Sequence, residues 1–306
     1  MKPKAIITLI LLGAALGTGS AQTRDFSRIR SMEDSLGIFA GQMVNAMDAN
    51  TRYQACMAFI PHLVHALETP YSFDYPFDSL KQVSIVYPPD SSFRIFTWAI
   101  TTNDGLSYRF YGTLQMHTRD GKLKLFPFFD NTRYTSDLDT VTSNKAWIGA
   151  LYYRVLENKR KGRNIYTLFG WHGVNFESNQ KLLEALSFKD GEPVFGAPVF
   201  DFSRDSVPGK TLNRFLLIYS KNGEVGLNYD PDQKLIVYDH LVSLTGKPEE
   251  KYTLVPDGTY EGFKWQGGSW VHLSRIFNTV SQKPPVPQPM KFKKNILEKD
   301  LQPGTP

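Results

Sequence analysis

The chain has 306 residues, of which 41% are hydrophobic and 13% aromatic, and its formal net charge is +5. This much apolar surface excludes a wholly disordered protein and is enough for one large domain, alone or with a smaller one. The excess of lysine lies at the two ends of the chain, so the body is close to neutral and the composition argues against a nucleic-acid partner.

The first residues have the pattern of an export signal. Two lysines precede an apolar run from Ala5 to Leu16, and Gly19 and Ala21 stand at the small-residue positions that a signal peptidase reads. The run is short for a bilayer core of about 30 Å, and no second apolar span follows it. The sequence therefore predicts a cleaved signal peptide over residues 1–21, export from the cytoplasm, and no transmembrane span after cleavage.

Residues 22–70 are expected to form a helical hairpin. In two segments the apolar residues recur at spacings of three and four, which predicts one buried stripe per helix. The polar link "DANT" between them offers Asp48 as a helix cap, and Pro61 is expected to kink the second helix or end it early. The lone Cys56 lies on the second stripe, where a thiol behaves as a small hydrophobe. The stripes consist of Ile29, Met32, Leu36, Phe39, Ala40, Met43 and Met47, and of Tyr53, Cys56, Met57, Ile60, Leu63, Val64 and Leu67.

From residue 71 to residue 277 the apolar period changes to two, which predicts an antiparallel β domain. Turn sequences such as "RKG" at Arg160, "PDG" at Pro256 and "QGG" at Gln266 separate the runs and indicate a meander of hairpins. "SNQKLLEALSF", which begins at Ser178, fits either a short helix or a strand. The expected strands lie near residues 82–87, 93–101, 106–116, 122–128, 147–155, 164–171, 193–200, 213–220, 225–229, 234–242, 252–255, 260–265 and 269–273.

The strand "FRIFTWAI" decides how this sheet must be covered. Alternation places Phe93, Ile95 and Ala99 on one face and Phe96, Trp98 and Ile100 on the other, so both faces are apolar. The predicted fold class is therefore mainly β with an N-terminal helical hairpin (α+β). Its antiparallel meander sheet is covered on both faces, as in a barrel, a sandwich or a propeller-like stack.

The last segment, residues 278–306, is rich in proline and lysine and has almost no apolar period. It is expected to be an extended, disordered tail that could dock on a partner.

Two short stretches are the candidate binding sites. In "YTLFGWHGVNFESNQ", alternation puts Phe169 and Trp171 on one face and His172 on the other, at a strand end marked by two glycines. In "YDHL", Tyr238 and His240 share one face and Asp239 the other, so the carboxylate and the imidazole cannot form a catalytic dyad. The hypothesis is a ligand-binding surface that uses Trp171, His172, Tyr238, Asp239 and His240.

Other motifs are weaker. The pair His62 and His65 could chelate a metal, but a helical wheel places both on an exposed face, so no metal site is predicted. Ser178 and Lys181 match "SxxK", yet the companion elements of the penicillin-recognising enzymes are missing. No phosphate-cradling loop or zinc pattern occurs, and no cofactor is predicted.

The blocks "YYRVLENK", "IYTLFGW", "PVFGAPVF" and "KLIVYDHL", in this order, resemble a family of uncharacterised exported proteins of Gram-negative bacteria. The resemblance covers most of the chain after about Ser92. It implies a single β-rich unit in the cell envelope, in the periplasm or at the cell surface, and it supplies no activity, ligand or catalytic residue.

The sequence leaves three functions open. The first is a non-catalytic envelope protein that binds another envelope protein or a small ligand through aromatic strand ends and loops. The second is a hydrolase whose site is assembled from separated residues such as His117, His172, Asp239 and His240. The third is an accessory subunit of a secretion or surface assembly, with the tail as its tether.

Overall fold

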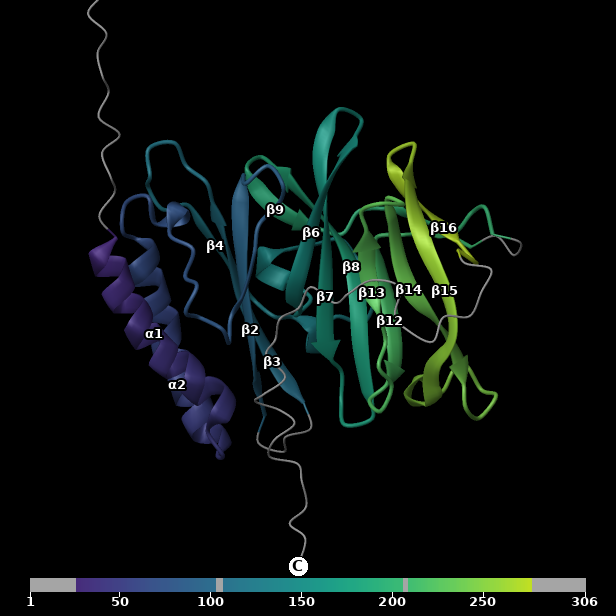
Figure 1. Cartoon of the computed structure of the whole chain (residues 1–306), viewed down its shortest axis with the longest axis horizontal. Helices are drawn as coiled ribbons and strands as arrows, with labels where there is room; N and C mark the ends of the chain where they lie inside the picture. Colours follow the sequence, from purple (N-terminus) through teal and green to yellow (C-terminus); the bar gives the residue numbers. More distant parts are fainter. Residues whose placement is uncertain (1–25, 103–106, 206–208, 277–306) are drawn as a thin grey trace, which may run out of the picture.

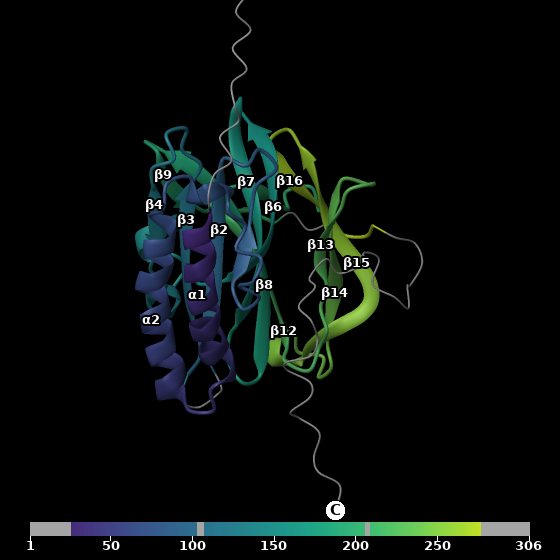
Figure 2. The same ribbon diagram turned by 60° about the vertical axis from the view of Figure 1, so that its left-hand side comes forward.

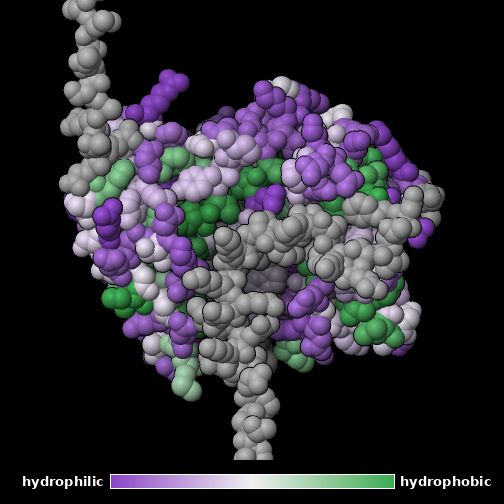
Figure 3. Space-filling view, viewed as in Figure 1, coloured by the Kyte–Doolittle hydropathy of each residue, from purple (hydrophilic) through white to green (hydrophobic). Residues whose placement is uncertain are grey.

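The structure is a computed structural model that describes residues 26–102, 107–205 and 209–276. The predicted signal peptide, residues 1–21, and the predicted tail, residues 278–306, lie outside the described residues. The helical hairpin, a first sheet, a middle sheet and a last sheet follow one another as layers (Figures 1 and 2). On the face drawn in Figure 3, hydrophilic residues cover much of the surface and hydrophobic residues show as separate patches.

The N-terminal helical hairpin is confirmed. Helix α1 spans Ser27–Asn45 and helix α2 spans Ala49–Leu67. Asp48 caps α2, because its carboxylate accepts a hydrogen bond from the backbone N–H of Thr51 at 2.8 Å. Of the two alternatives for Pro61, a kink or an early end of α2, the early end is wrong: the helix continues through Pro61 to Leu67, since tertiary packing of the apolar face outweighs one lost backbone bond.

Four residues of the predicted apolar stripe of α1 are buried, but its last residue, Met47, is not. Met47 is 99% exposed, because α1 has already ended at Asn45. Glu33 lies inside the stripe and is buried, where it accepts hydrogen bonds from the hydroxyl of Tyr75 and from the backbone N–H of Ser79. The buried apolar residues of α1 are Ile29, Leu36, Ala40 and Met43.

Three sheets follow. The first sheet has the order β1-β2-β3-β4, with β1 Ser84–Val86, β2 Phe93–Thr101, β3 Tyr108–Met116 and β4 Leu125–Phe128. The middle sheet has the order β5-β9-β8-β7-β6, with β5 Thr142–Ser143, β6 Leu151–Arg160, β7 Arg163–Gly173, β8 Ser178–Lys189, β9 Glu192–Phe195, and β12 Arg214–Ser220 paired to β8. The last sheet has the order β11-β10-β16-β15-β14-β13, with β10 Phe200–Asp201, β11 Thr211–Leu212, β13 Leu227–Asp230, β14 Leu235–Ser243, β15 Leu254–Gln266 and β16 Ser269–Leu273.

The connections depart from a simple meander at two places. The ambiguous segment at Ser178 is strand β8, and it carries both β9 and β12 along one edge: β12 pairs with its first half and β9 with its second. Strands β10 and β16 pair in parallel. Both departures join segments far apart in the chain, which periodicity cannot show.

Two strand boundaries differ from the prediction. In both, a glycine with positive φ is present, and such a glycine can either end a strand or form a β-bulge inside it. The expected strand 193–200 is divided at Gly196, which has a φ of +90°, and its halves join different sheets. The expected turn at Pro256 lies inside the single strand β15. There Gly258, with a φ of +85°, accompanies a register shift opposite β14.

The prediction that both faces of β2 are covered is confirmed residue by residue. Phe96, Trp98 and Ile100 pack in the core beneath the helices, whereas Phe93 and Ile95 pack in the core between the first and middle sheets. A further core lies between the middle and last sheets. The described residues form stacked sheets, antiparallel except for the pair β10 and β16, without a closed barrel, which selects the sandwich-like alternative.

Candidate functional site

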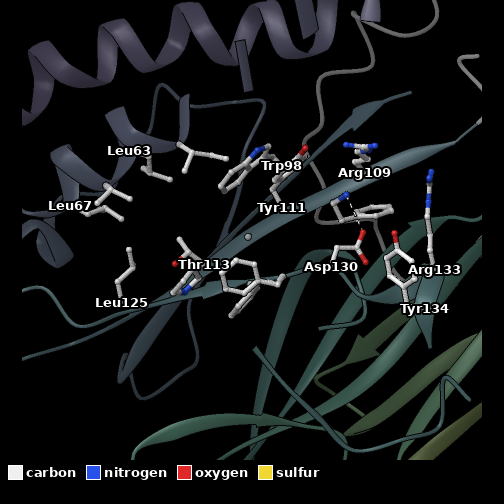
Figure 4. A pocket seen from close by; sticks show the side chains of 17 residues that line it. Leu63, Leu67, Trp98, Arg109, Tyr111, Thr113, Leu125, Asp130, Arg133 and Tyr134 are labelled. Atoms are coloured by element: carbon white, nitrogen blue, oxygen red, sulfur yellow. Dashed lines mark hydrogen bonds between the residues drawn. The ribbon is translucent and has the colours of Figure 1, made fainter. Parts of the chain in front are cut away.

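A pocket of about 500 Å³ opens between helix α2 and the first sheet (Figure 4). It exists because β4 is short. Residues 125–128 of β4 pair with residues 112–115 of β3. On the edge of β3 opposite to β2, the segment from Arg109 to Tyr111 therefore has no neighbouring strand in the described part of the chain. After Phe128 the chain leaves the sheet and forms a short 3-10 helix, Thr132–Tyr134, at the end of the pocket.

The wall of the pocket is apolar and comes from two directions. Helix α2 supplies four residues at spacings of three and four along one face, namely Ile60, Leu63, Val64 and Leu67. The first sheet supplies Trp98 and Tyr111, whose rings are stacked with centroids 6.0 Å apart. The predicted apolar stripe of α2 therefore lines a cavity in addition to packing in a core.

Gly112 lets the strands around the pocket approach one another. A Cβ atom there would lie 2.8 Å from the ring of Phe128 and 2.9 Å from the carbonyl oxygen of Phe96. Neither contact is compatible with a side chain, so the close approach of β3 to β2 and β4 requires glycine.

The polar groups gather at one end. In Figure 4, Arg109, Asp130, Arg133 and Tyr134 lie at one end of the pocket and Leu63, Leu67 and Leu125 at the other. The carboxylate of Asp130 is already occupied. It accepts hydrogen bonds from the N–H and hydroxyl of Thr132, at 3.0 and 2.6 Å, and from the N–H of Phe110 at 3.4 Å.

The two arginines at this end are exposed, and neither lies within 4.0 Å of a carboxylate oxygen belonging to a residue that the structure describes. Among the residues that the structure describes, the guanidinium of Arg133 has one hydrogen bond, to the hydroxyl of Ser107 at 3.3 Å. The end of the pocket therefore holds two guanidinium groups and one carboxylate, that of Asp130, and no ion pair within 4.0 Å is formed between them.

The rest of the wall stays neutral at physiological pH. Burial raises the pKa of Tyr111 to about 12, with the Cys56 sulfur adding to the effect. Cys56, which lies outside the pocket lining in the core beneath the helices, has its pKa raised to about 11 by burial, against a hydrogen bond from the indole of Trp98. An ionic ligand group would consequently be recognised at the arginine end alone.

Trp171 and His172, two of the predicted ligand-binding residues, reach the pocket only through Phe110. The indole of Trp171 packs against Tyr108 and Phe110, with ring centroids 5.3 and 6.3 Å away, and is hydrogen-bonded to Tyr219 of the core between the middle and last sheets. His172 stacks on Phe110 at 4.5 Å, and one ring nitrogen, Nδ1, lies 2.6 Å from the carbonyl oxygen of Gly149. Burial lowers the pKa of His172, although Gly149 and Asp130 oppose the shift.

Tyr238 and His240 lie in a different place, in a polar network on the last sheet. The hydroxyl of Tyr238 is 2.8 Å from Nε2 of His272, whose Nδ1 lies 2.9 Å from the carboxylate of Asp205. His240 is 2.9 Å from Asp257 through Nδ1, and Glu261 lies between the two imidazoles, 3.5 Å from His272 and 4.0 Å from His240.

This network satisfies its own members. Both nitrogens of His272 have partners, and Tyr238 is only 3% exposed, so neither offers a free group to a ligand. Asp239 points elsewhere, as alternation predicts: its carboxylate accepts a hydrogen bond from the N–H of Gly226 at 2.5 Å. The predicted trio is thus divided between two environments.

The residues named for a hydrolase do not meet. The ring of His117 stacks on Phe73, with centroids 4.5 Å apart. His172, Asp239 and His240 each have other partners. Among the described residues, no hydrogen bond or ion pair joins any two of these four side chains. Ser178 and Lys181 both lie on strand β8, where an odd spacing puts them on opposite faces, which agrees with setting the "SxxK" match aside.

The helix pair His62 and His65 also has local partners. His62 lies 2.7 Å from the carbonyl oxygen of Ala58, and His65 lies 3.3 Å from the carboxylate of Glu68. Among the described residues, no three histidine, cysteine or acidic side chains are grouped so that they could hold a metal ion.

Arg109 and Arg133 were not among the predicted site residues. The sequence shows the apolar face of α2, but that face becomes a pocket wall only because β4 stops short and the 3-10 helix closes the end. The two arginines are 24 positions apart in the numbering and come together through this tertiary arrangement.

Comparison of the chain with protein-family models, with curated proteins and with solved structures finds no match. The resemblance to exported proteins therefore stays a prediction. No helix within residues 26–102, 107–205 and 209–276 is both long enough and apolar enough to span a bilayer.

Proposed function

We propose that this protein is an exported binding protein that holds an elongated apolar molecule with an anionic head group in the pocket beside helix α2. The observation that carries the proposal is the arrangement of that pocket, apolar along its wall and bounded at one end by Arg109 and Arg133. Its location outside the cytoplasm rests on the signal pattern of residues 1–21.

The geometry suits this ligand class for two physical reasons. A volume of about 500 Å³ lies in the range of small-molecule sites, which are mostly apolar with a few polar groups that fix orientation. Each methylene transferred from water to such a wall contributes about 0.8 kcal/mol, while a guanidinium can pair both oxygens of a carboxylate or phosphate. Chain burial would supply most of the affinity and the arginines the orientation.

The test is a titration with saturated fatty acids of 8 to 16 carbons, in which displacement of cis-parinaric acid is followed by energy transfer from tryptophan, including Trp98 in the wall. The affinity is expected to rise about fourfold per methylene until the pocket is full. The alcohol of equal length should bind about tenfold more weakly, because it lacks the charge.

Variants locate the binding. The double change Arg109→Gln and Arg133→Gln should weaken the acid about tenfold and leave the alcohol nearly unchanged, whereas Arg119→Gln, an exposed arginine outside the pocket, should affect neither. Leu125→Trp should block both ligands by filling the cavity. Equal affinities for acid and alcohol, or an unchanged affinity in the Leu125→Trp variant, would contradict the proposal.

A further inference from the structure

The most exposed apolar side chains of the protein gather at one end of the molecule. Among the described residues, the three most exposed large apolar side chains are Met47 at 99%, Tyr134 at 84% and Leu244 at 74%. Phe176 and Tyr252 are exposed as well. All five lie in turns or in short 3-10 helices, outside the long helices and the strands. In Figure 1 the α1–α2 turn, the β7–β8 turn and the β14–β15 connection lie at the lower edge of the molecule.

The first two of these side chains lie where β2 ends and β3 begins. The guanidinium of Arg52 donates to the carbonyl oxygen of Met47 at 2.9 Å and to a carbonyl oxygen at the end of β2 at 3.3 Å. The guanidinium of Arg133 donates to the hydroxyl of Ser107, which comes just before β3. Tyr134, the residue after Arg133, is therefore at the same end of the first sheet as Met47.

The other three come from the middle and last sheets. The backbone N–H of Lys221, at the end of β12, donates to the carbonyl oxygen of the residue after Phe176 at 2.8 Å. The Nζ atom of Lys221 lies 5.6 Å from the ring centroid of Tyr108, the first residue of β3. Leu244 and Tyr252 belong to the β14–β15 connection, whose 3-10 helix packs against β12. The five side chains thus share one end of the stacked layers.

This arrangement fits a broad apolar phase better than a single partner chain. The side chains come from the helical hairpin and from all three sheets, so they extend across the full width of the end and do not line one groove. Exposed apolar groups of this kind mark interaction sites, and tyrosine is enriched where a membrane meets water. The charged residues beside them have both signs, so net charge contributes little. They are Asp48, Arg133, Glu177, Lys221, Lys247 and Glu250.

We propose that this end is a membrane-docking surface, at which Met47, Tyr134, Phe176, Leu244 and Tyr252 insert into the interfacial region of a phospholipid bilayer. Each side chain that leaves water adds to the affinity in proportion to the apolar area that it buries. The attachment is peripheral and reversible. The arginine end of the pocket opens on the same end, because Arg133 and Tyr134 also line the pocket. Docking does not require the pocket to hold a ligand, so it stands apart from the proposed function.

A fluorescent label placed at single positions tests the insertion directly. Because Cys56 is buried, an NBD dye can be attached selectively in the full-length variants Met47→Cys, Phe176→Cys and Leu244→Cys. With phosphatidylcholine vesicles, the emission of each is expected to shift to shorter wavelength, and nitroxide-labelled lipid should quench it, because the dye leaves water. Ile38→Cys is the control, since this side chain is 64% exposed but lies midway along α1. Vesicle binding without a response at the three positions, or with an equal response at position 38, would overturn the proposal.

Charged substitutions measure what the apolar side chains contribute. The triple variant Met47→Asp, Phe176→Asp and Leu244→Asp should partition onto the same vesicles at least about a hundredfold more weakly, because carboxylates resist leaving water. Ile38→Asp should have little effect, and circular dichroism checks that both variants are folded. Undiminished partitioning of the triple variant would contradict docking through this end.

The same vesicles separate docking from ligand binding. None of the three substituted side chains lines the pocket, so the triple variant should bind fatty acids in solution as the wild type does. Leu125→Trp, which fills the pocket, should dock on vesicles with unchanged affinity. A Leu125→Trp variant that no longer docks would show that the pocket, and not the apolar end, makes the contact with lipid.

Discussion

Strand β8 carries two buried charged residues on opposite faces, Glu184 and Lys181, and their surroundings differ completely. Glu184 faces the first sheet and is 0% exposed, and the guanidinium of Arg214 donates to it through Nε at 2.6 Å. Tyr152 donates to the same carboxylate and accepts from the indole of Trp147 at 2.7 Å. Lys181 faces the last sheet, with aromatic rings around it and Asp239 at a distance.

The difference separates a buried charge that the fold satisfies from one that it does not. Removing a charge from water costs several kcal/mol, and a fold recovers this only with a partner and full hydrogen bonding. The pair of Glu184 and Arg214 meets that condition, and Arg214 donates further hydrogen bonds to the carbonyl oxygens of Leu138 and Thr140. Lys181 does not meet it, so the fold gains no stability from its charge.

The largest effect is expected when one partner of the satisfied pair is removed. Arg214→Met leaves the carboxylate of Glu184 buried without its counter-charge, and the free energy of unfolding should fall by roughly 3–5 kcal/mol. Urea denaturation at pH 7, followed by tryptophan fluorescence, measures this. The double variant Arg214→Met with Glu184→Leu should recover most of the loss, because no buried charge remains. A single variant that loses less than about 1 kcal/mol would show that the pair is not decisive for stability.

For Lys181→Met, the free energy of unfolding is expected to rise and not to fall. The wild-type amine has a lower pKa in the folded protein, about 8, than in the unfolded chain, so its protonated form disfavours folding. Methionine should therefore stabilise the protein at pH 7, by about 1–3 kcal/mol. The gain should fade between pH 8 and about pH 10.5, because the wild-type amine then loses its proton in the folded state before it does so in the unfolded chain. Urea titrations at pH 7 and pH 10 measure the change in the free energy of unfolding at each pH. If Lys181→Met destabilised the protein at pH 7, the charge of Lys181 would be stabilising, like that of Glu184.

A feature of this protein could be predicted from the sequence when the residues that form it are close together in the chain. Alternation within β2 assigned Phe96 and Trp98 to one core and Phe93 and Ile95 to another, as the structure has them. That inference needs only neighbouring residues and the knowledge that strands alternate. The helical hairpin was predictable for the same reason, because its apolar spacing and its cap are local.

The sites were harder to predict because their members come from separate segments. Tyr238 and His240 were named from one short motif, but their partners Asp205, Glu261 and His272 join them only through the pairing of β14, β15 and β16. The pocket depends on where β4 stops, and Lys181 on the pairing of β12 with β8. A single sequence has no signal for such long-range pairing, so these arrangements follow from the structure alone.

The smallest effect tests whether a buried charge stabilises the fold because it has hydrogen-bond partners, and not because of the sheet on which it lies. His272 lies on the last sheet like Asp239, yet it has partners on both nitrogens. Burial lowers its pKa, but hydrogen bonds from the imidazole to Glu261 and Asp205 outweigh this, and the net shift is upward. The other groups around it are Tyr238 and, beyond Glu261, His240.

A raised pKa means that the protonated imidazole stabilises the fold. This contribution is fully present below about pH 6.5 and is lost as the pH rises through the folded-state pKa. His272→Gln should therefore destabilise the protein by about 1 kcal/mol at pH 6 and by less at pH 8.5. Glu261 remains ionised at pH 6, because hydrogen bonds from His272 and Tyr238 lower its pKa despite burial. If His272→Gln instead stabilised the protein at pH 6, as Lys181→Met should at pH 7, the hydrogen bonds of His272 would not compensate its burial, and partner count would no longer distinguish the two sites.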